Sequence, residues 1–229
     1  MKKVKSKKCI IEYLGEKNFG EESYINLEDL NEPKKSKPKL LLHSCCGPCS
    51  TTAVERLIDN YDITIFFFNP NITDKEEYER RKSSQIDFIE QYNKSKNSRG
   101  RIQFLEGTYD PKIFYKAVTN LEDEPEGGKR CTVCFQLRLE KTAETASMTG
   151  HECFTTALSV SPHKNYQLIY KIGSGLAMRY GLSFHGEDFK KMAGYQRSIE
   201  LSRIYDLYRQ NYCGCSFSAR PTKKVLEDK

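Results

Sequence analysis

Short apolar runs alternate with longer segments of helical spacing from residue 39 onward. Five strands are predicted, for the runs KLLLHS (39–44), DITIFFFNPNI (62–72), RIQFLEG (101–107), HECFTTALS (151–159) and LSFH (182–185). The spacing of apolar residues predicts helices over 51–60, 74–94, 109–118, 131–146 and 165–181, and a mostly helical segment over 188–210. Strands that alternate with helices in this way predict an α/β fold with a parallel sheet.

The expected fold is a Rossmann-like (HUP-like) parallel sheet flanked by helices, with a C-terminal helical and loop region that carries Cys213 and Cys215. Residues 1–38 lack sustained periodicity and end in PKKSKPK, so we expect a basic and partly flexible N-terminal extension. Residues 39–229 are predicted to form a single α/β domain.

Polar side chains lie at or just after the ends of four of the predicted runs, the second of which is stopped by Asn69 and Pro70. The carboxyl ends of parallel strands meet at one edge of a sheet, where α/β proteins bind their ligands. The residues expected at this edge are Cys45, Cys46, Cys49, Asn69, Asn71, Asp110, Ser159 and Ser161. We therefore predict the functional site there.

Nine cysteines are the most unusual feature of the composition. The basic start of the sequence has too short an apolar stretch for a signal peptide, and no apolar run approaches the length of a membrane span. We therefore expect a cytoplasmic protein, and in a reducing compartment clustered cysteines indicate metal binding or redox chemistry. Cys9 and Cys153 stand alone, and Cys153 is expected in the core.

Cys131 and Cys134 lie three residues apart in a predicted helix, which places both thiols on one face. Gly127 and Gly128 precede them and permit a tight turn into the helix, whose dipole favours thiolates near its first turn. A single CxxC pair is compatible with a zinc half-site, a redox pair or ligands of an iron–sulfur cluster.

Cys45, Cys46 and Cys49 form a second group in HSCCGPCS. A disulfide between adjacent cysteines strains the peptide between them, whereas adjacent thiolates can both bind metal. Together with Cys131 and Cys134 they make five soft ligands, and a tetrahedral zinc needs only four. Five sulfurs suit an iron–sulfur cluster held by four thiolates, with one to spare.

Cys213 and Cys215 flank Gly214, whose missing side chain tolerates the bend of a very small disulfide ring. Strained disulfides are the easily reduced, catalytic ones, so we predict a reversible dithiol/disulfide pair. Two further metal ligands are the alternative.

Charge and missing motifs narrow the class of function. The net charge is +6, and residues 190–229 hold nine Lys/Arg against four Asp/Glu, which suits a partner that carries phosphates. The Tyr/Arg alternation in RIYDLYRQNY is compatible with base stacking and phosphate binding. No GxGxxG or GxxxxGK[ST] motif is present to recruit a dinucleotide or a nucleoside triphosphate. A redox reaction would therefore draw its electrons from an external donor.

Six segments together resemble the non-cobalamin epoxyqueuosine reductase family, QueH, over residues 39 to 218. They are HSCCGPCS, FFFNPNITDKEEYERR, EGGKRCTVCFQLRLEKTA, FTTALSVSPHKN, FKKMAGYQRSIELSR and LYRQNYCGCSFS. The resemblance implies reduction of epoxyqueuosine to queuosine at the wobble position of tRNAs with a GUN anticodon, the acceptors of Asp, Asn, His and Tyr. Two electrons and two protons would remove the epoxide oxygen as water.

The resemblance also implies a set of site residues. Cys45, Cys46, Cys131 and Cys134 match the ligands of a 4Fe-4S cluster, and Cys213 with Cys215 matches a redox-active pair. An additional mononuclear iron, or zinc, beside the cluster is implied as well, with Cys49 and Asp110 as its candidate ligands. Asp110 is alternatively a candidate proton donor.

Two other interpretations remain open at this point. In one, the sulfurs hold structural zinc in an RNA-binding module without redox activity. In the other, the protein is a nucleotide-dependent tRNA-modifying enzyme of the pyrophosphatase type. That class requires a phosphate loop resembling SGGxDS, whereas HSCCGPCS carries bulky thiols at this place.

Overall fold

Five parallel strands form one sheet in the computed structural model, which describes residues 37–218. The strands are β1 (Lys39–His43), β2 (Asp62–Phe67), β3 (Gln103–Glu106), β4 (Cys153–Thr156) and β5 (Ser183–Phe184). Their order in the sheet is β3-β2-β1-β4-β5. The predicted α/β fold class is confirmed, while the predicted extension over residues 1–38 lies almost entirely outside the described residues.

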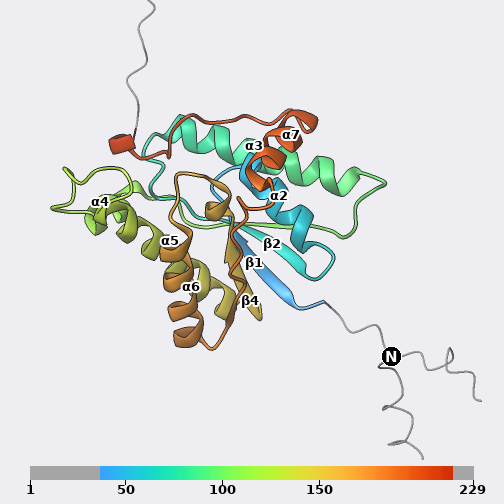
Figure 1. Cartoon of the computed structure of the whole chain (residues 1–229), viewed down its shortest axis with the longest axis horizontal. Helices are drawn as coiled ribbons and strands as arrows, with labels where there is room; N and C mark the ends of the chain where they lie inside the picture. Colours follow the sequence, from blue (N-terminus) through green and yellow to red (C-terminus); the bar gives the residue numbers. More distant parts are fainter. Residues whose placement is uncertain (1–36, 219–229) are drawn as a thin grey trace, which may run out of the picture. The chain divides into compact units, whose positions relative to one another are not determined.

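Helices cover both faces of the sheet (Figure 1). They are α2 (Gly47–Leu57), α3 (Lys75–Lys94), α4 (Pro111–Ala117), α5 (Lys129–Met148), α6 (Tyr166–Tyr180) and α7 (Gly194–Ile204). One face packs against α2 and α3, with α7 lying on α2, and the other packs against α5 and α6. Within residues 37–218, no helix combines the length and apolar character needed to span a bilayer.

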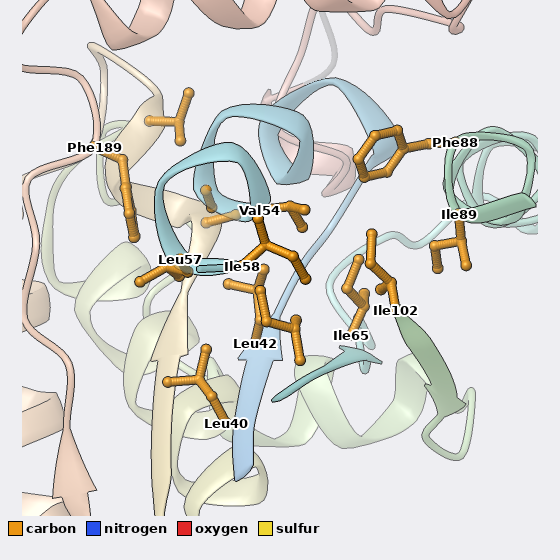
Figure 2. Packing of buried hydrophobic residues seen from close by; sticks show 14 of the residues in the cluster. Leu40, Leu42, Val54, Leu57, Ile58, Ile65, Phe88, Ile89, Ile102 and Phe189 are labelled. Carbon is orange, nitrogen blue, oxygen red and sulfur yellow. The ribbon is translucent and has the colours of Figure 1, made fainter. Parts of the chain in front are cut away.

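The central strand β1 has three consecutive leucines, Leu40, Leu41 and Leu42, because both of its faces are buried there. Leu40 and Leu42 lie in one cluster with Val54 of α2 and with Ile58, the residue that follows this helix (Figure 2). Leu41 alternates to the opposite face and packs with the α5 cluster. All three leucines are fully buried, and burial of each side chain contributes about 1.5–3 kcal/mol to folding.

The direction of chain progression across the sheet reverses at β1. This strand pairs with β2 on one side and β4 on the other, so that His43 lies opposite both Phe66 and Thr156. Successive strands β1, β2 and β3 are laid down in one direction, and β4 and β5 are then added on the other side. Such a switch point opens a crevice at the carboxyl ends of the strands. The segment that leaves β1 at this point contains Cys45 and Cys46.

The segment 188–210 was predicted to be mostly helical, but it is helical over α7 alone. Met192 and Ala193 have φ angles of 49° and 56°, so the helix cannot extend backward through them. At the other end, Asp206 has φ of 49° and the amide of Leu207 donates to the carbonyl of Ser202, which ends the helix in a Schellman-type turn.

The fourth strand is also shorter than the predicted range of 151–159. It ends at Thr156, whose hydroxyl accepts a hydrogen bond from the amide of Leu158 and begins a 3-10 turn, η1 (Ala157–Val160). The first helix starts earlier than predicted, at Gly47, because Pro48 is well suited to the first turn of a helix. As a result, Cys49 lies in α2 rather than in a loop.

Candidate active site

The turn between β1 and α2 is held by a network of buried polar groups. The hydroxyl of Ser44 donates to Gln85 Oε1 at 2.8 Å, and Asn69 Nδ2 donates to the carbonyl of Ser44 at 2.9 Å. A side chain at Gly47 would lie 2.6 Å from the carbonyl oxygen of Ser84 on α3, so only glycine permits this close approach. The network fixes the backbone that presents the first cysteine group.

Cys45, Cys46 and Cys49 lie at this turn as free thiols. Cys46 is fully buried, and Gln210 Nε2 donates to its sulfur at 3.0 Å. A hydrogen bond with Cys46 and burial raise the pKa of Cys45 well above its ordinary value. The hydrogen bond with Cys45 lowers the pKa of Cys46, but a bond with Cys49 and burial outweigh it and raise this pKa to about 12. A cation is therefore needed to hold these sulfurs as thiolates.

Cys131 and Cys134 lie in the first turns of α5, on one face, as predicted. The turn into the helix uses Gly127 in a left-handed conformation with φ of 90°, and the amide of Gly127 donates to Cys131 Sγ at 3.2 Å. Cys134 is buried, which raises the pKa of its thiol to about 12. A bound metal would replace the thiol proton at this position.

Cys213 and Cys215 are brought to the same place by an extended C-terminal segment. Arg81 of α3 donates to the carbonyls of Tyr212 and Cys213, each at 3.1 Å, and Lys164 Nζ donates to Cys213 Sγ at 2.9 Å. Gly214 has φ of 112°, which favours glycine. Both cysteines are free thiols here, so the described conformation is that of the dithiol.

The three cysteine groups surround two adjoining cavities. The larger, of about 300 Å³, is lined by Cys45, Cys49 and Cys213. The smaller, of about 10 Å³, is lined by Cys131, Cys134, Cys213 and Cys215. Shared wall residues are Glu126, Arg138, Lys164, Cys213 and Ser218. The structure thus brings together cysteines from three distant segments, at the predicted edge of the sheet.

Arg138 is the most unusual residue of this site. It comes from α5, has 1% of its surface exposed and lines both cavities. Among the described residues, no carboxylate lies within salt-bridge distance of it, although a buried unpaired charge is very costly. Burial alone would lower the pKa of the Arg138 guanidinium. The nearby sulfurs outweigh this effect and raise the pKa overall; they are those of Cys134, Cys213, Cys45 and Cys131. Glu126 lines both cavities too, but it lies within salt-bridge distance of Lys164 and not of Arg138, so among the described residues the cysteine sulfurs are the groups that compensate the charge of Arg138.

Several buried polar atoms at the cavities have no hydrogen-bond partner among the described residues. They are the side-chain nitrogen and oxygen of Asn71, Nε of Arg130, Nη2 of Arg138 and Oε1 of Gln210. Nearly all buried polar groups in native proteins are paired, so a cluster of unpaired ones indicates a ligand. Soft thiol donors, a buried positive charge and unpaired donors together suit a negatively charged metal–sulfur centre.

Asp110 is placed differently from the cysteines. Its carboxylate accepts a hydrogen bond from the amide of Lys112 at 2.9 Å and caps α4, and it lines neither cavity. The carboxylate in the shared wall is Glu126, which lies 3.8 Å from Lys164 Nζ. Sequence reasoning missed Glu126, Lys164 and Arg138. For Arg138, a signal was available, because it lies four residues after Cys134 and therefore on the same helix face.

The remaining residues are divided between the cavity wall and the core. Arg209, Gln210 and Tyr212 of the Tyr/Arg-rich segment line the larger cavity, as does Ser161. His43 is fully buried, and burial lowers its pKa to about 3, so it is a neutral packed residue beneath the site. Cys153 is buried in the core, as predicted, and Cys9 lies outside the described residues.

Comparison with known proteins gives one consistent result. The family model described as Epoxyqueuosine reductase QueH matches residues 40–221. An epoxyqueuosine reductase QueH from Streptococcus pyogenes serotype M1 is 45% identical over 190 residues, which cover 82% of this chain and 73% of that protein. Proteins of the same name from Staphylococcus epidermidis and Staphylococcus aureus are each 44% identical, over 185 and 190 residues. These alignments cover 80% and 82% of this chain, and 77% and 78% of the two relatives.

Proposed function

Because the chain belongs to the epoxyqueuosine reductase QueH family, we propose that it reduces epoxyqueuosine to queuosine at the wobble position of tRNA. Family membership makes it an oxidoreductase of queuosine biosynthesis. The proposed substrates are the tRNAs with a GUN anticodon, which accept Asp, Asn, His and Tyr. The reaction consumes two electrons and two protons and yields an alkene and water, and the electrons come from an external donor.

The observation that carries this proposal is the convergence of three cysteine groups on a buried, unpaired arginine. A 4Fe-4S cluster would be held by Cys45, Cys46, Cys131 and Cys134. When bound, such a cluster supplies electrons one at a time, and an adjacent iron supplies a Lewis acid for an oxygen. Cys49, which lines the larger cavity, and Asp110 stay the proposed ligands of that additional iron or zinc.

The larger cavity is the proposed site of the modified base. Its volume of about 300 Å³ lies at the lower end of the range for small-molecule sites, about 300–1,000 Å³. Arg209 and Tyr212 at its wall provide a cation and an aromatic face, the groups that bind a splayed base and its phosphate. Cys213 faces both cavities, so the pair of Cys213 and Cys215 is placed to exchange electrons and protons between them.

Protons must reach the same place as the electrons. Lys164 Nζ, which lies 2.9 Å from Cys213 Sγ and 3.8 Å from the carboxylate of Glu126, is buried in the wall shared by both cavities. We assign the relay of protons to this pair, with the proton held at Nζ or at a carboxylate oxygen of Glu126. Asp110 caps a helix outside the cavities and remains the alternative donor.

The test is anaerobic purification followed by assay of iron, sulfide and visible absorption. Wild-type protein is expected to be brown, with about four or more irons per chain. Replacing Cys134 by Ala should remove the chromophore and the activity together. Cys153→Ala is the matched control, because Cys153 is an equally buried cysteine in the core, away from both cavities. A colourless wild-type protein that holds only zinc would overturn the proposal, as would full activity of the Cys134 variant without iron.

A further inference from the structure

We propose that Arg138 is the internal counter-charge of the metal–sulfur centre, and that it makes this centre easier to reduce. The inference rests on the proposed function, since it assumes that thiolates hold the centre. It concerns a residue that neither binds metal nor contacts the substrate in any assigned role.

Burial of Arg138 is costly unless negative charge compensates it. The side chain of Arg138 is 1% exposed, and its only hydrogen bond in the described structure runs from Nε to the carbonyl of Cys134 at 3.3 Å. Nη2 is buried without a partner. A buried guanidinium that faces no carboxylate persists only where other negative charge compensates it.

Arg138 lies close to sulfurs of all three cysteine groups. It interacts electrostatically with Cys134, Cys213, Cys45 and Cys131, which together represent all three cysteine groups. It also lines both cavities, whereas Arg81 and Arg130 each line only one. Lys164 lines both cavities as well, but it lies 3.8 Å from the carboxylate of Glu126. Among the described residues, Arg138 is therefore the positive charge that both cavities share and that has no carboxylate within salt-bridge distance.

The positive charge of Arg138 would raise the reduction potential of the metal–sulfur centre. Reduction adds negative charge to a metal–sulfur centre, and a nearby positive charge or hydrogen-bond donor stabilises the reduced form more than the oxidised form. The donor Nη2 has no protein partner, so it is available to a sulfur of the centre. Removing Arg138 should therefore lower the reduction potential.

Arg130 provides a matched control on the same helix. It is 4% exposed, but its Nη1 already donates to the carbonyls of Leu121 and Glu122 at 3.1 and 2.7 Å, and its guanidinium lies over the ring of Phe217. The charge of Arg138 lowers the pKa values of the Cys45 and Cys134 thiols, whereas the charge of Arg130 is not among their main causes of shift. Losing Arg130 should therefore affect packing more than the potential.

The experiment is a redox titration of anaerobically purified, iron-loaded protein, followed by its visible absorption, for wild type, R138M, R138Q, R138K and R130M. At a fixed potential, the ratio of reduced to oxidised centre in R138M and R138Q should fall at least tenfold, which corresponds to about 59 mV for a one-electron couple. R138K, which retains the charge, should stay much closer to wild type, and R130M should lower the ratio less than R138M does.

Other results of this experiment also support or overturn the role of Arg138. Folded R138M and R138Q that lose iron while R138K retains it would support the counter-charge, because only the charge separates these variants. Iron-loaded R138M and R138Q with wild-type potentials would overturn the inference and leave the proposed function intact. Equal loss of iron in R138K and R138M would also overturn it, since the charge would then be irrelevant. A wild-type chain without iron would overturn both the inference and the proposed function.

Discussion

Replacing Arg81 by Met should remove the hydrogen bonds that hold the segment carrying Cys213 against α3. Arg81 is 1% exposed and binds three groups: its Nε donates to Glu77 Oε1 at 2.7 Å, and its terminal nitrogens donate to the carbonyls of Tyr212 and Cys213 at 3.1 Å each. One side chain thus ties α3 to the C-terminal segment. The substitution removes an ion pair and two backbone anchors while keeping similar bulk.

The magnitude follows from the charge left behind. Glu77 is 5% exposed and would keep the hydrogen bond from Tyr208 at 2.9 Å and a weak contact with Arg80 at 3.8 Å. Breaking a buried ion pair by removing one partner costs about 3–5 kcal/mol. A small domain is stable by about 5–15 kcal/mol, so this loss would be a large part of the total. The double variant R81M/E77Q removes the stranded charge and should recover at least about 1 kcal/mol of it.

Urea denaturation followed by far-ultraviolet circular dichroism measures this effect, and is suitable because the chain contains no tryptophan. The rate of thiol–disulfide exchange at Cys213 and Cys215, measured on the same samples, should change because their backbone is no longer fixed. A loss of stability below about 1 kcal/mol, at an unchanged denaturant slope, would refute the reasoning. It would place the Arg81–Glu77 pair in the class of weak surface ion pairs.

Three further predictions concern the glycine of the CGC segment, the core and the response to acid. Gly214→Ala should destabilise the protein by about 1–3 kcal/mol, because φ is 112° there and a Cβ would lie 3.0 Å from Ile72 Cγ1; an unchanged urea midpoint would contradict this. Leu42→Ala, at a fully buried position of β1, should cost about 2–5 kcal/mol, whereas Met178→Ala at an 82% exposed position should stay within about 0.5 kcal/mol; equal effects would contradict the description of the core. Hydrogen bonding to His185 lowers the pKa of Glu187 below its ordinary value of 4.5, and Arg56 contributes as well. The carboxylate therefore stabilises the fold above this ordinary value and stops doing so as the pH falls through the lowered pKa. Glu187→Gln should reduce stability at pH 7 and make it less dependent on pH below 4.5, and parallel wild-type and variant curves would contradict this.

The sheet and the place of Cys45, Cys46 and Cys49 at its edge were predictable because both depend on short-range patterns, whereas the approach of Cys213 depends on contacts with Arg81 and Lys164, which are distant in sequence. Alternating apolar runs and helices specify parallel strands, and parallel strands place the residues after β1 and β2 at one edge. Helical spacing alone placed Cys131 and Cys134 on one face. The end of α7 was not predictable in this way, because Asp206 adopts a left-handed conformation that few non-glycine residues use.

The wall residues were harder to predict for a different reason. A lysine, glutamate or arginine in a polar stretch usually faces solvent, and Glu126 and Lys164 come from two loops whose approach depends on tertiary packing. Asp110 illustrates the opposite case. Its place after a strand suggested a ligand, yet the same position before Pro111 is also that of a helix cap, which it forms in the structure.

The nucleoside content of tRNA that carries epoxyqueuosine, after anaerobic incubation with this protein and dithionite, tests the central claim most directly. Queuosine, lighter than the starting nucleoside by one oxygen atom, should accumulate with wild-type protein and with Cys153→Ala, and should be absent with Cys134→Ala. Unchanged epoxyqueuosine in the presence of iron-loaded wild-type protein and this electron source would contradict the account.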